Sequence, residues 1–302
     1  MKSLRTLPLL ASLLLAGCFG HADVKPVAPP PTPAKIRIGL ALGGGAAKGF
    51  AHIGVIKMLE ASGIHPDVVA GTSAGSVVGA LYASGMDAFT LQEQAFSLDE
   101  AKIRDVGFFG GGLVKGELLE DYVNTLVNKR PIQGLSLPFA AVATNLQTGD
   151  RAVFVSGNTG QAVRASSSIP GVFQPTDING VPYVDGGVVS PVPVDAARQL
   201  GADIVIAVDI SAKASRTRPE GMMGVVGQSI TIMGQKLGEQ ELARADVVIR
   251  PKVGQIGPTD FDAKNMAILE GERAALAAIP AIKAAIAAKQ ESRAIPAGTF
   301  SK

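Results

Sequence analysis

The sequence predicts an α/β fold in which a largely parallel β-sheet is covered by helices on both faces. From Ile36 onward, short apolar runs alternate with stretches of helical periodicity, the pattern of strand–helix–strand units. Several of these runs are nearly continuous in apolar residues, as in strands that are buried on both faces. Apolar residues make up 47% of the 302-residue chain and charged residues 18%, which is enough for a large core and excludes a disordered chain.

The predicted strands are short apolar runs bounded by turn-forming residues. We place them at Ile36–Leu42, Val68–Ala70, Phe139–Thr144, Arg151–Val155, Ile204–Asp209 and Val247–Arg250. Thr148-Gly149-Asp150 separates two of these runs and favours a hairpin, so the sheet is expected to be mixed.

The predicted helices lie between the strands, at Ala46–Ala61, Gly75–Ala83, Gly116–Val127, Pro193–Leu200, Val225–Ala243 and Lys264–Lys289. Pro280 should kink or divide the last helix, whose alanine-rich face is expected to pack on the sheet. An apolar stripe leads into and along the Val225 helix. We expect it to pack in the core, with the lining of an acyl pocket as the alternative, and it comprises Met222, Met223, Val225, Val226, Ile230, Ile232 and Met233.

The N-terminus resembles a bacterial lipoprotein leader. Lys2 and Arg5 precede the uncharged run Leu7–Ala16, which has signal-peptide length and is too short to span a bilayer as a helix. Small residues then precede Cys18, the only cysteine of the chain. We therefore expect residues 1–17 to be a signal peptide and Cys18 to be lipidated; an ordinary signal peptide with an incidental cysteine is the alternative.

A proline-rich segment follows the cysteine, which favours an extended stalk over residues 18–34. Residue Phe19 is not the aspartate that retains lipoproteins at the inner membrane of enteric bacteria, so we expect a protein of the cell envelope that is lipid-anchored at the outer membrane. Residues 35–290 are predicted to form one domain, followed by a tail of residues 291–302. The membrane face and the oligomeric state are left open.

The net charge gives no reason to expect nucleic acid as a partner. The chain carries 28 basic and 26 acidic residues, and removal of the leader with Lys2 and Arg5 leaves 26 basic against 26 acidic. A neutral chain lacks the electrostatic attraction that brings proteins to a phosphate backbone.

The first predicted strand runs into a glycine-rich turn, Gly43-Gly44-Gly45-Ala46-Ala47-Lys48-Gly49, followed by a helix. Backbone N–H groups at such a turn suit a bound phosphate or a developing oxyanion. The Walker pattern fails because Lys48 is followed by glycine instead of Ser or Thr. The dinucleotide pattern also fails, because Lys48 stands where its last glycine belongs.

The second strand ends in Gly71-Thr72-Ser73-Ala74-Gly75, which matches the G-x-S-x-G nucleophile elbow. Glycines on both sides permit the sharp turn that exposes the Ser73 hydroxyl at a helix N-terminus. The Ala74 N–H is a candidate oxyanion donor at that position.

The base that would activate Ser73 is not a histidine in an α/β-hydrolase order, because His21, His52 and His65 all precede the serine. We expect a core or capping role for His52 and a solvated position for His65. A buried carboxylate with a raised pKa can serve as base, and Asp185, between an apolar run and two glycines, is the best candidate. From the local sequence, a turn aspartate explains the position equally well.

These segments resemble the patatin-like phospholipases. The glycine-rich turn, the Ser73 elbow, the segment 165–171 (Ala-Ser-Ser-Ser-Ile-Pro-Gly) and Asp185-Gly186-Gly187 occur in that family's order and approximate spacing. The resemblance covers roughly Ile36 to Asp209. It implies a three-layer α/β/α fold, a Ser73–Asp185 dyad, and an oxyanion hole at Gly43, Gly44 and Gly45 with Lys48 in the same loop.

The resulting hypothesis is a serine acyl hydrolase that acts on fatty-acyl esters of phospholipids or lysophospholipids through an acyl-enzyme, without metal or cofactor. A non-catalytic lipid-binding envelope lipoprotein and an acyltransferase are the alternatives. Lys48 is expected to contact substrate. The segment 108–113 could be a lid or a buried turn, and Ser166–Ser168 could shape the floor of the site.

Overall fold

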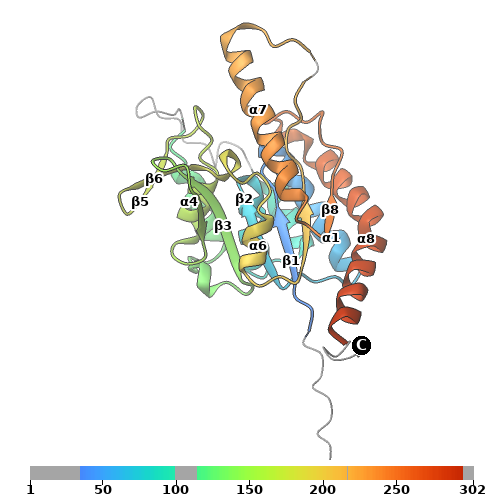
Figure 1. The fold of residues 1–302 in the computed structure, drawn as a ribbon. Helices are drawn as coiled ribbons and strands as arrows, with labels where there is room; N and C mark the ends of the chain where they lie inside the picture. Colours follow the sequence, from blue (N-terminus) through green and yellow to red (C-terminus); the bar gives the residue numbers. More distant parts are fainter. Residues whose placement is uncertain (1–34, 99–113, 216, 295–302) are drawn as a thin grey trace, which may run out of the picture. The chain divides into compact units, whose positions relative to one another are not determined.

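The computed structural model describes residues 35–98, 114–215 and 217–294, and they form a sheet covered by helices on both faces (Figure 1). The sheet has eight strands in the order β5-β6-β3-β2-β1-β7-β8, with β4 also paired to β3. The predicted three-layer α/β/α class with a mainly parallel centre is therefore confirmed.

The centre of the sheet is parallel and one side is antiparallel. The parallel strands are β1 (Ile38–Leu42), β2 (Val68–Thr72), β3 (Phe139–Asn145), β7 (Ile204–Val208) and β8 (Val247–Ile249). The antiparallel strands are β4 (Arg151–Phe154), β5 (Thr176–Ile178) and β6 (Val181–Asp185). The predicted hairpin at residues 148–150 joins β3 to β4. Strands β5 and β6 were not predicted, because β5 has a single apolar residue among three and Pro182 interrupts the apolar run of β6.

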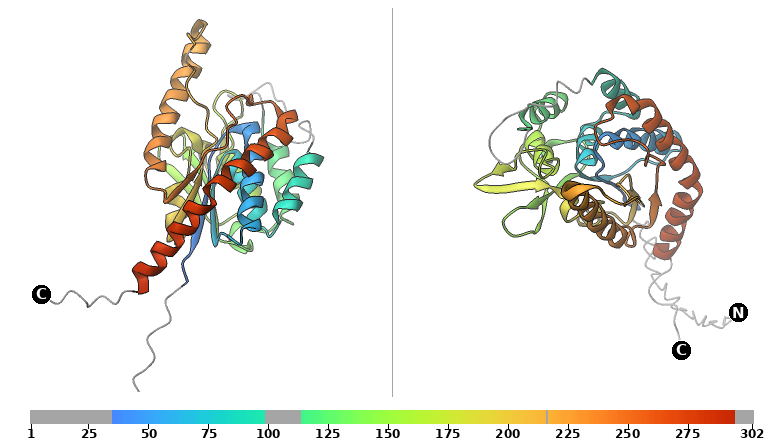
Figure 2. Two further views of the ribbon diagram at one scale, coloured as in Figure 1. Left: turned by 90° about the vertical axis from the view of Figure 1, so that its right-hand side faces the viewer. Right: turned by 90° about the horizontal axis from the view of Figure 1, so that it is seen from above.

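Two separate groups of buried side chains fill the spaces between the sheet and its two helix layers. One face carries α1 (Phe50–Ala61), α2 (Ala74–Ala83), α3 (Ala88–Ser97), α4 (Glu117–Leu126), α5 (Thr159–Ser166) and α8 (Lys264–Ala294). The other carries α6 (Val194–Gln199) and the end of α7 (Gly221–Leu242), as Figure 2 shows from two directions. Short 3₁₀ turns include η1 (Ala46–Gly49), η4 (Gly186–Val188) and η5 (Phe261–Ala263).

Of the two predicted effects of Pro280, a kink or a division, the division does not occur, because α8 runs through Pro280 as one helix. The carbonyl that loses its intrahelical partner belongs to Leu276, which is exposed, as is Pro280 itself. Ala275 and Ile282 are buried on either side of it, and packing of the helix against α1 holds both halves together. The helix therefore packs on α1 in addition to the sheet, and it continues to Ala294, into the segment expected to be a tail.

The apolar stripe of α7 is exposed to solvent, which corrects its predicted place in the core. Met222, Val226, Ile230 and Met233 are each exposed, whereas Leu242 at the end of the helix is buried. The N-terminal half of α7 extends past the carboxyl ends of the parallel strands (Figures 1 and 2). None of the helices within the described ranges is long and apolar enough to cross a bilayer.

Strand β3 holds the ends of β2 and β6 next to each other. Val142 of β3 pairs with Thr72 of β2 and also with β4, while the adjacent Ala143 pairs with Asp185 of β6 and also with β4. Because a strand has only two edges, β2 and β6 must share the edge opposite β4. The last residues of β2 and β6 therefore occupy neighbouring positions on one edge of β3.

Candidate active site

Ser73 lies on a sharp turn between β2 and α2. Its backbone has φ 53° and ψ −126°, a conformation that residues other than glycine rarely adopt and that costs energy to maintain. The flanking glycines are required by close packing: a Cβ on Gly71 would lie 2.3 Å from the Gly75 carbonyl oxygen, and a Cβ on Gly75 would lie 2.1 Å from the Leu42 carbonyl oxygen. The elbow is therefore pressed against the end of β1.

Hydrogen bonds from both sides hold this turn in place. The Ser73 N–H donates to Ser166 Oγ over 2.9 Å, and the Ser166 hydroxyl donates to the Val142 carbonyl over 2.6 Å. The Thr72 hydroxyl donates to the Ser190 carbonyl over 2.8 Å. Ser166 is thus a structural support of the elbow, and its position next to Ser73 could not be inferred from the sequence.

Asp185 lies at the end of β6 with its carboxyl group beside the Ser73 side chain, close enough for the serine hydroxyl to influence the carboxyl pKa. The residue is buried, and the Gly187 N–H donates to its Oδ1 over 2.7 Å. Burial raises the pKa of Asp185 to about 6, although the hydrogen bonds from Ser73 and Gly187 act in the opposite direction. The structure therefore brings the two predicted residues together, and the carboxylate beside the hydroxyl is more basic than an ordinary aspartate.

The glycine-rich turn lies directly against Ser73, since a Cβ on Gly44 would be 3.2 Å from the Ser73 Cβ. The Gly43 and Gly44 N–H groups already donate to the carbonyls of Val208 and Pro191, both over 3.0 Å. Two of the predicted oxyanion donors are therefore engaged inside the fold in this conformation. Gly45 and Ala74 retain backbone N–H groups with no acceptor among the described residues.

His52, on α1, binds the backbone of the glycine-rich turn. Its imidazole is fully buried on α1, and Nε2–H donates to the Gly43 carbonyl over 2.8 Å. Burial lowers the pKa of His52 to about 4, so the ring is neutral at physiological pH. The predicted core role of His52 is confirmed, and His65 is exposed as expected. His21 lies outside the described residues.

Lys48 is buried in η1 and does not line the cavity next to Ser73. Burial and the nearby charge of Lys213 lower the pKa of Lys48, while Asp209 acts in the opposite direction. Lys48 therefore cannot contact a substrate in this cavity as predicted, because it is not one of the lining residues.

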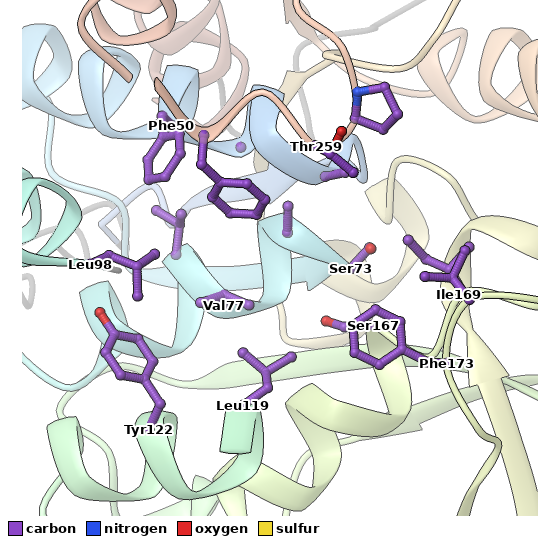
Figure 3. A pocket seen from close by; sticks show the side chains of 17 residues that line it. Phe50, Ser73, Val77, Leu98, Leu119, Tyr122, Ser167, Ile169, Phe173 and Thr259 are labelled. Carbon is purple, nitrogen blue, oxygen red and sulfur yellow. The ribbon is translucent and has the colours of Figure 1, made fainter. Parts of the chain in front are cut away.

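A cavity of about 260 Å³ opens beside Ser73 and is lined almost entirely by apolar side chains (Figure 3). The walls come from α1, α2, α4 and the segments around residues 169–173 and 258–261, and they include Phe50, Val77, Leu119, Tyr122, Ile169, Phe173 and Phe261. Ser167 also lines the cavity, and its buried hydroxyl has no hydrogen-bond partner among the described residues. The cavity can therefore hold a narrow apolar chain with one polar group near its reactive end.

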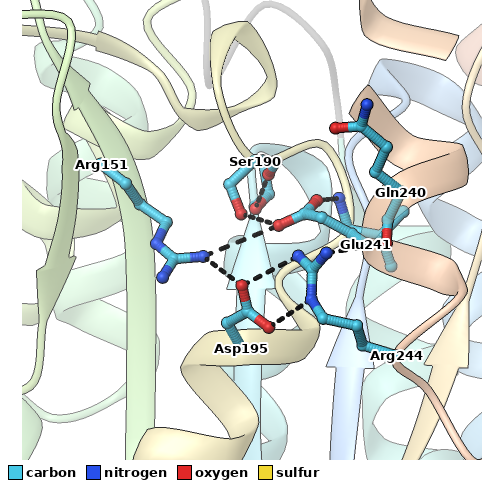
Figure 4. Close-up of polar contacts among 8 residues, drawn as sticks. Arg151, Ser190, Asp195, Gln240, Glu241 and Arg244 are labelled. Atoms are coloured by element: carbon cyan, nitrogen blue, oxygen red, sulfur yellow. Dashed lines mark hydrogen bonds and ion pairs between the residues drawn. The ribbon is translucent and has the colours of Figure 1, made fainter. Parts of the chain in front are cut away.

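Glu241, near the end of α7, binds the loop that follows Asp185. The Ser190 hydroxyl donates to Glu241 Oε1 over 2.5 Å and the Val192 N–H donates to Oε2 over 2.8 Å (Figure 4). The same loop accepts the hydrogen bonds from Thr72 and Gly44 described above. Glu241 therefore anchors the loop on which the elbow and the glycine-rich turn both rest.

Charged side chains surround Glu241 on the outer side of this loop. Arg151 Nη1 lies 3.8 Å from Glu241 and 3.1 Å from Asp195, while Arg244 binds both oxygens of Asp195 over 2.8 and 2.9 Å (Figure 4). Burial nevertheless raises the pKa of Glu241 to about 7. No local sequence signal identifies Glu241, because the loop that it binds lies about fifty residues earlier in the chain.

Two predictions fall on residues that the structure does not describe. Cys18 with the leader and stalk lies outside the described residues, and so does the segment 108–113 that was considered as a lid. Within the described part of the chain, no cluster of His, Cys, Asp and Glu side chains could hold a metal ion.

Comparison with known proteins places these features in a family. A family model for patatin-like phospholipase matches residues 40–198, which include Ser73 and Asp185. An uncharacterized NTE family protein of Mycobacterium bovis is 37% identical over 179 residues, 58% of this chain and 49% of that protein. Lysophospholipase NTE1 of Pyricularia oryzae is 35% identical over 179 residues, 57% of this chain and 12% of that protein. The chain thus matches about half or less of these relatives' length.

A solved structure shares the fold. VipD from Legionella pneumophila superposes with a TM-score of 0.55 over 86% of this chain and 67% of VipD, at 15% sequence identity. At that identity the likeness concerns the fold alone.

Proposed function

Because the chain belongs to the patatin-like phospholipase family, we propose that it is a serine acyl hydrolase that cleaves fatty-acyl esters of phospholipids or lysophospholipids through Ser73 and Asp185. The observation that carries the proposal is the contact of a strained, elbow-borne serine with a buried carboxylate at an apolar cavity. A lysophospholipase among the relatives supports the same substrate class.

In the first half of the reaction, Asp185 accepts the proton of the Ser73 hydroxyl while Oγ attacks the ester carbonyl carbon. The tetrahedral intermediate collapses by breaking the bond to the alcohol oxygen, which takes up the proton held by Asp185. The fatty acid stays on Ser73 as an ester. A carboxylate with a pKa of about 6 remains ionised at neutral pH and is a stronger base than an ordinary aspartate.

In the second half, water replaces the alcohol. Asp185 takes a proton from water as the water oxygen attacks the acyl carbon. The ester bond to Ser73 Oγ then breaks, and Oγ takes up the proton from Asp185 as the fatty acid leaves. The negative charge on the carbonyl oxygen is stabilised by the N–H groups of Gly45 and Ala74, the latter at the positive end of the α2 dipole. Gly43 and Gly44 contribute by fixing the turn.

The apolar cavity accommodates the acyl chain. Its volume lies just below the range usual for small-molecule pockets, which suits one extended chain better than two. Burial of methylene groups there contributes about 0.8 kcal/mol each. The Ser167 hydroxyl is available to bind an oxygen of the ester group.

The dyad is tested with full-length Ser73→Ala and Asp185→Asn variants on a panel of defined phospholipids, lysophospholipids and short-chain esters, with identification of the products. We expect both variants to lose about a thousandfold or more in kcat/KM. A fluorophosphonate probe should label the wild type at Ser73 only. Ser292→Ala, at an exposed serine near the end of α8, is the matched control. Near-wild-type turnover in either dyad variant, or labelling elsewhere, would contradict the assignment; absence of any turnover or labelling in the wild type would favour a non-catalytic lipid-binding protein.

The location of the protein is a separate part of the proposal. The sequence of the leader supports an envelope lipoprotein attached to the outer membrane through Cys18. Metabolic labelling with a fatty acid should mark the wild-type chain and leave Cys18→Ser unlabelled, and membrane fractionation identifies the membrane. Equal labelling of both chains would refute lipidation at Cys18.

A further inference from the structure

Helix α7 turns its polar side toward the protein and its apolar side toward solvent. Gln228 exchanges hydrogen bonds with the backbone of Ser215, and Gln235 accepts one from the Ala214 N–H. The opposite side of the helix carries what we call the α7 apolar face, formed by Met222, Val225, Val226, Ile230 and Met233. This orientation is the reverse of that in an ordinary surface helix, which buries its apolar stripe.

The exposure of this face is large. Met222 is 78% exposed, Ile230 57% and Met233 58%, and their spacing places them along one side of the helix. The glutamine contacts and the buried Leu242 at the helix end hold α7 in this orientation. Single exposed apolar residues are common on proteins, but a continuous apolar helix face indicates that something covers it.

The charges around the face suit an anionic lipid surface. The stretch from Gly221 to Gln235 contains no charged residue, and the preceding residues 210–220 carry three basic side chains against one acidic one, Lys213, Arg216 and Arg218 against Glu220. Lys213 is paired with Asp209, so Arg216 and Arg218 against Glu220 leave a net charge of +1 in the sequence just before the helix. An amphipathic helix binds to the bilayer interface through its apolar face, and basic residues beside it add attraction to anionic lipids.

The position of the helix links it to the reaction. Its N-terminal half extends past the carboxyl ends of the parallel strands, the same end of the sheet at which Ser73 follows β2 (Figures 1 and 2).

We propose that the α7 apolar face docks on an anionic lipid bilayer and holds the end of the sheet that carries Ser73 at the lipid interface. The docking stands on the orientation and charge of α7, while its purpose, delivery of membrane lipid to the cavity, rests on the function proposed above.

The test measures binding to vesicles without catalysis or a lipid anchor. The full chain carrying Cys18→Ser and Ser73→Ala is mixed with phosphatidylcholine vesicles with or without phosphatidylglycerol, and bound protein is sedimented. In this background, Met222→Gln with Ile230→Gln removes two side chains of the α7 apolar face. Leu269→Gln with Leu276→Gln on α8 is the matched control, since both leucines are exposed and lie away from that face.

We expect binding that is stronger with phosphatidylglycerol, that weakens about tenfold or more in the α7 pair, and that is unchanged in the α8 pair. Equal binding of the α7 pair and the unsubstituted background, or no binding by that background, would overturn the proposal. A dimer of the unsubstituted background in sedimentation equilibrium without lipid, absent in the α7 pair, would also overturn the proposal, because a second copy of the chain would then cover the α7 apolar face.

A parallel assay separates docking from the proposed function. With Ser73 intact, the α7 pair should hydrolyse a dispersed short-chain ester at the wild-type rate and vesicle phospholipid about tenfold more slowly. If no ester is hydrolysed by any chain, the proposed function fails, while the vesicle-binding result still decides the docking.

Discussion

Replacement of Glu241 by glutamine should change how the stability of the protein depends on pH. Glu241→Gln keeps the size of the side chain and an acceptor oxygen for one of the two hydrogen bonds from Ser190 and Val192, but removes the ionisable group. Burial raises the pKa of Glu241 from 4.5 to about 7. Any part of the pH dependence that belongs to this carboxyl group should therefore disappear in the variant.

The sign follows from proton linkage. Between pH 4.5 and about 7, the folded protein keeps a proton on Glu241 that the unfolded chain releases. The contribution is fully present below pH 4.5 and is lost as the pH rises toward 7. At 1.36 kcal/mol per pKa unit, the shift corresponds to at most about 3 kcal/mol of unfolding free energy.

The assay is urea unfolding of the wild type and Glu241→Gln at several values between pH 4.5 and 8. Asp185, with its raised pKa, adds a slope of the same sign to the pH dependence, and His52, with its lowered pKa, adds one of opposite sign. Both groups are present in both proteins, so the difference between the two unfolding free energies isolates Glu241. Glu93→Gln, at an exposed position on α3, is the control and should run parallel to the wild type. Parallel curves for Glu241→Gln and the wild type would refute the reasoning.

Further predictions concern the reaction and the core. For a neutral ester, kcat/KM should fall as the pH drops through about 6, because Asp185 must be ionised to act as base; activity constant down to pH 4.5 would exclude it from that role. Ser167→Ala should lower kcat/KM several-fold through loss of one hydrogen bond worth about 1 kcal/mol, without loss of stability in urea, whereas an unchanged kcat/KM would show that the hydroxyl does not meet the ester. Gly54→Ala should destabilise the protein by about 2 kcal/mol or more, since the new Cβ would lie 2.0 Å from the Ile268 carbonyl oxygen. Gly227→Ala, in open space on α7, should instead raise the unfolding free energy by up to about 1 kcal/mol. Similar urea midpoints for the two variants would contradict the α1–α8 packing.

The nucleophile elbow illustrates what local sequence can specify. Gly71 and Gly75 mark a turn too tight for side chains, and the apolar run before them has the composition of a buried strand. Such features depend on neighbouring residues alone, so they can be recognised before any contact is known. The order of the histidines likewise left Asp185 as the best candidate partner for Ser73, without placing the two side chains in space.

Only the tertiary structure decided how these local pieces meet. The sequence determined most of the strands, most of the helices and the turn chemistry, because periodicity and glycine spacing act over a few residues. The contact of Ser73 with Asp185 depends on β3 pairing with β2 and β6 along one edge, and the role of Glu241 depends on a loop about fifty residues away. The outward apolar face of α7 has the same cause: a helical pattern fixes which residues share a side, while the neighbours packed against the helix determine which side faces solvent.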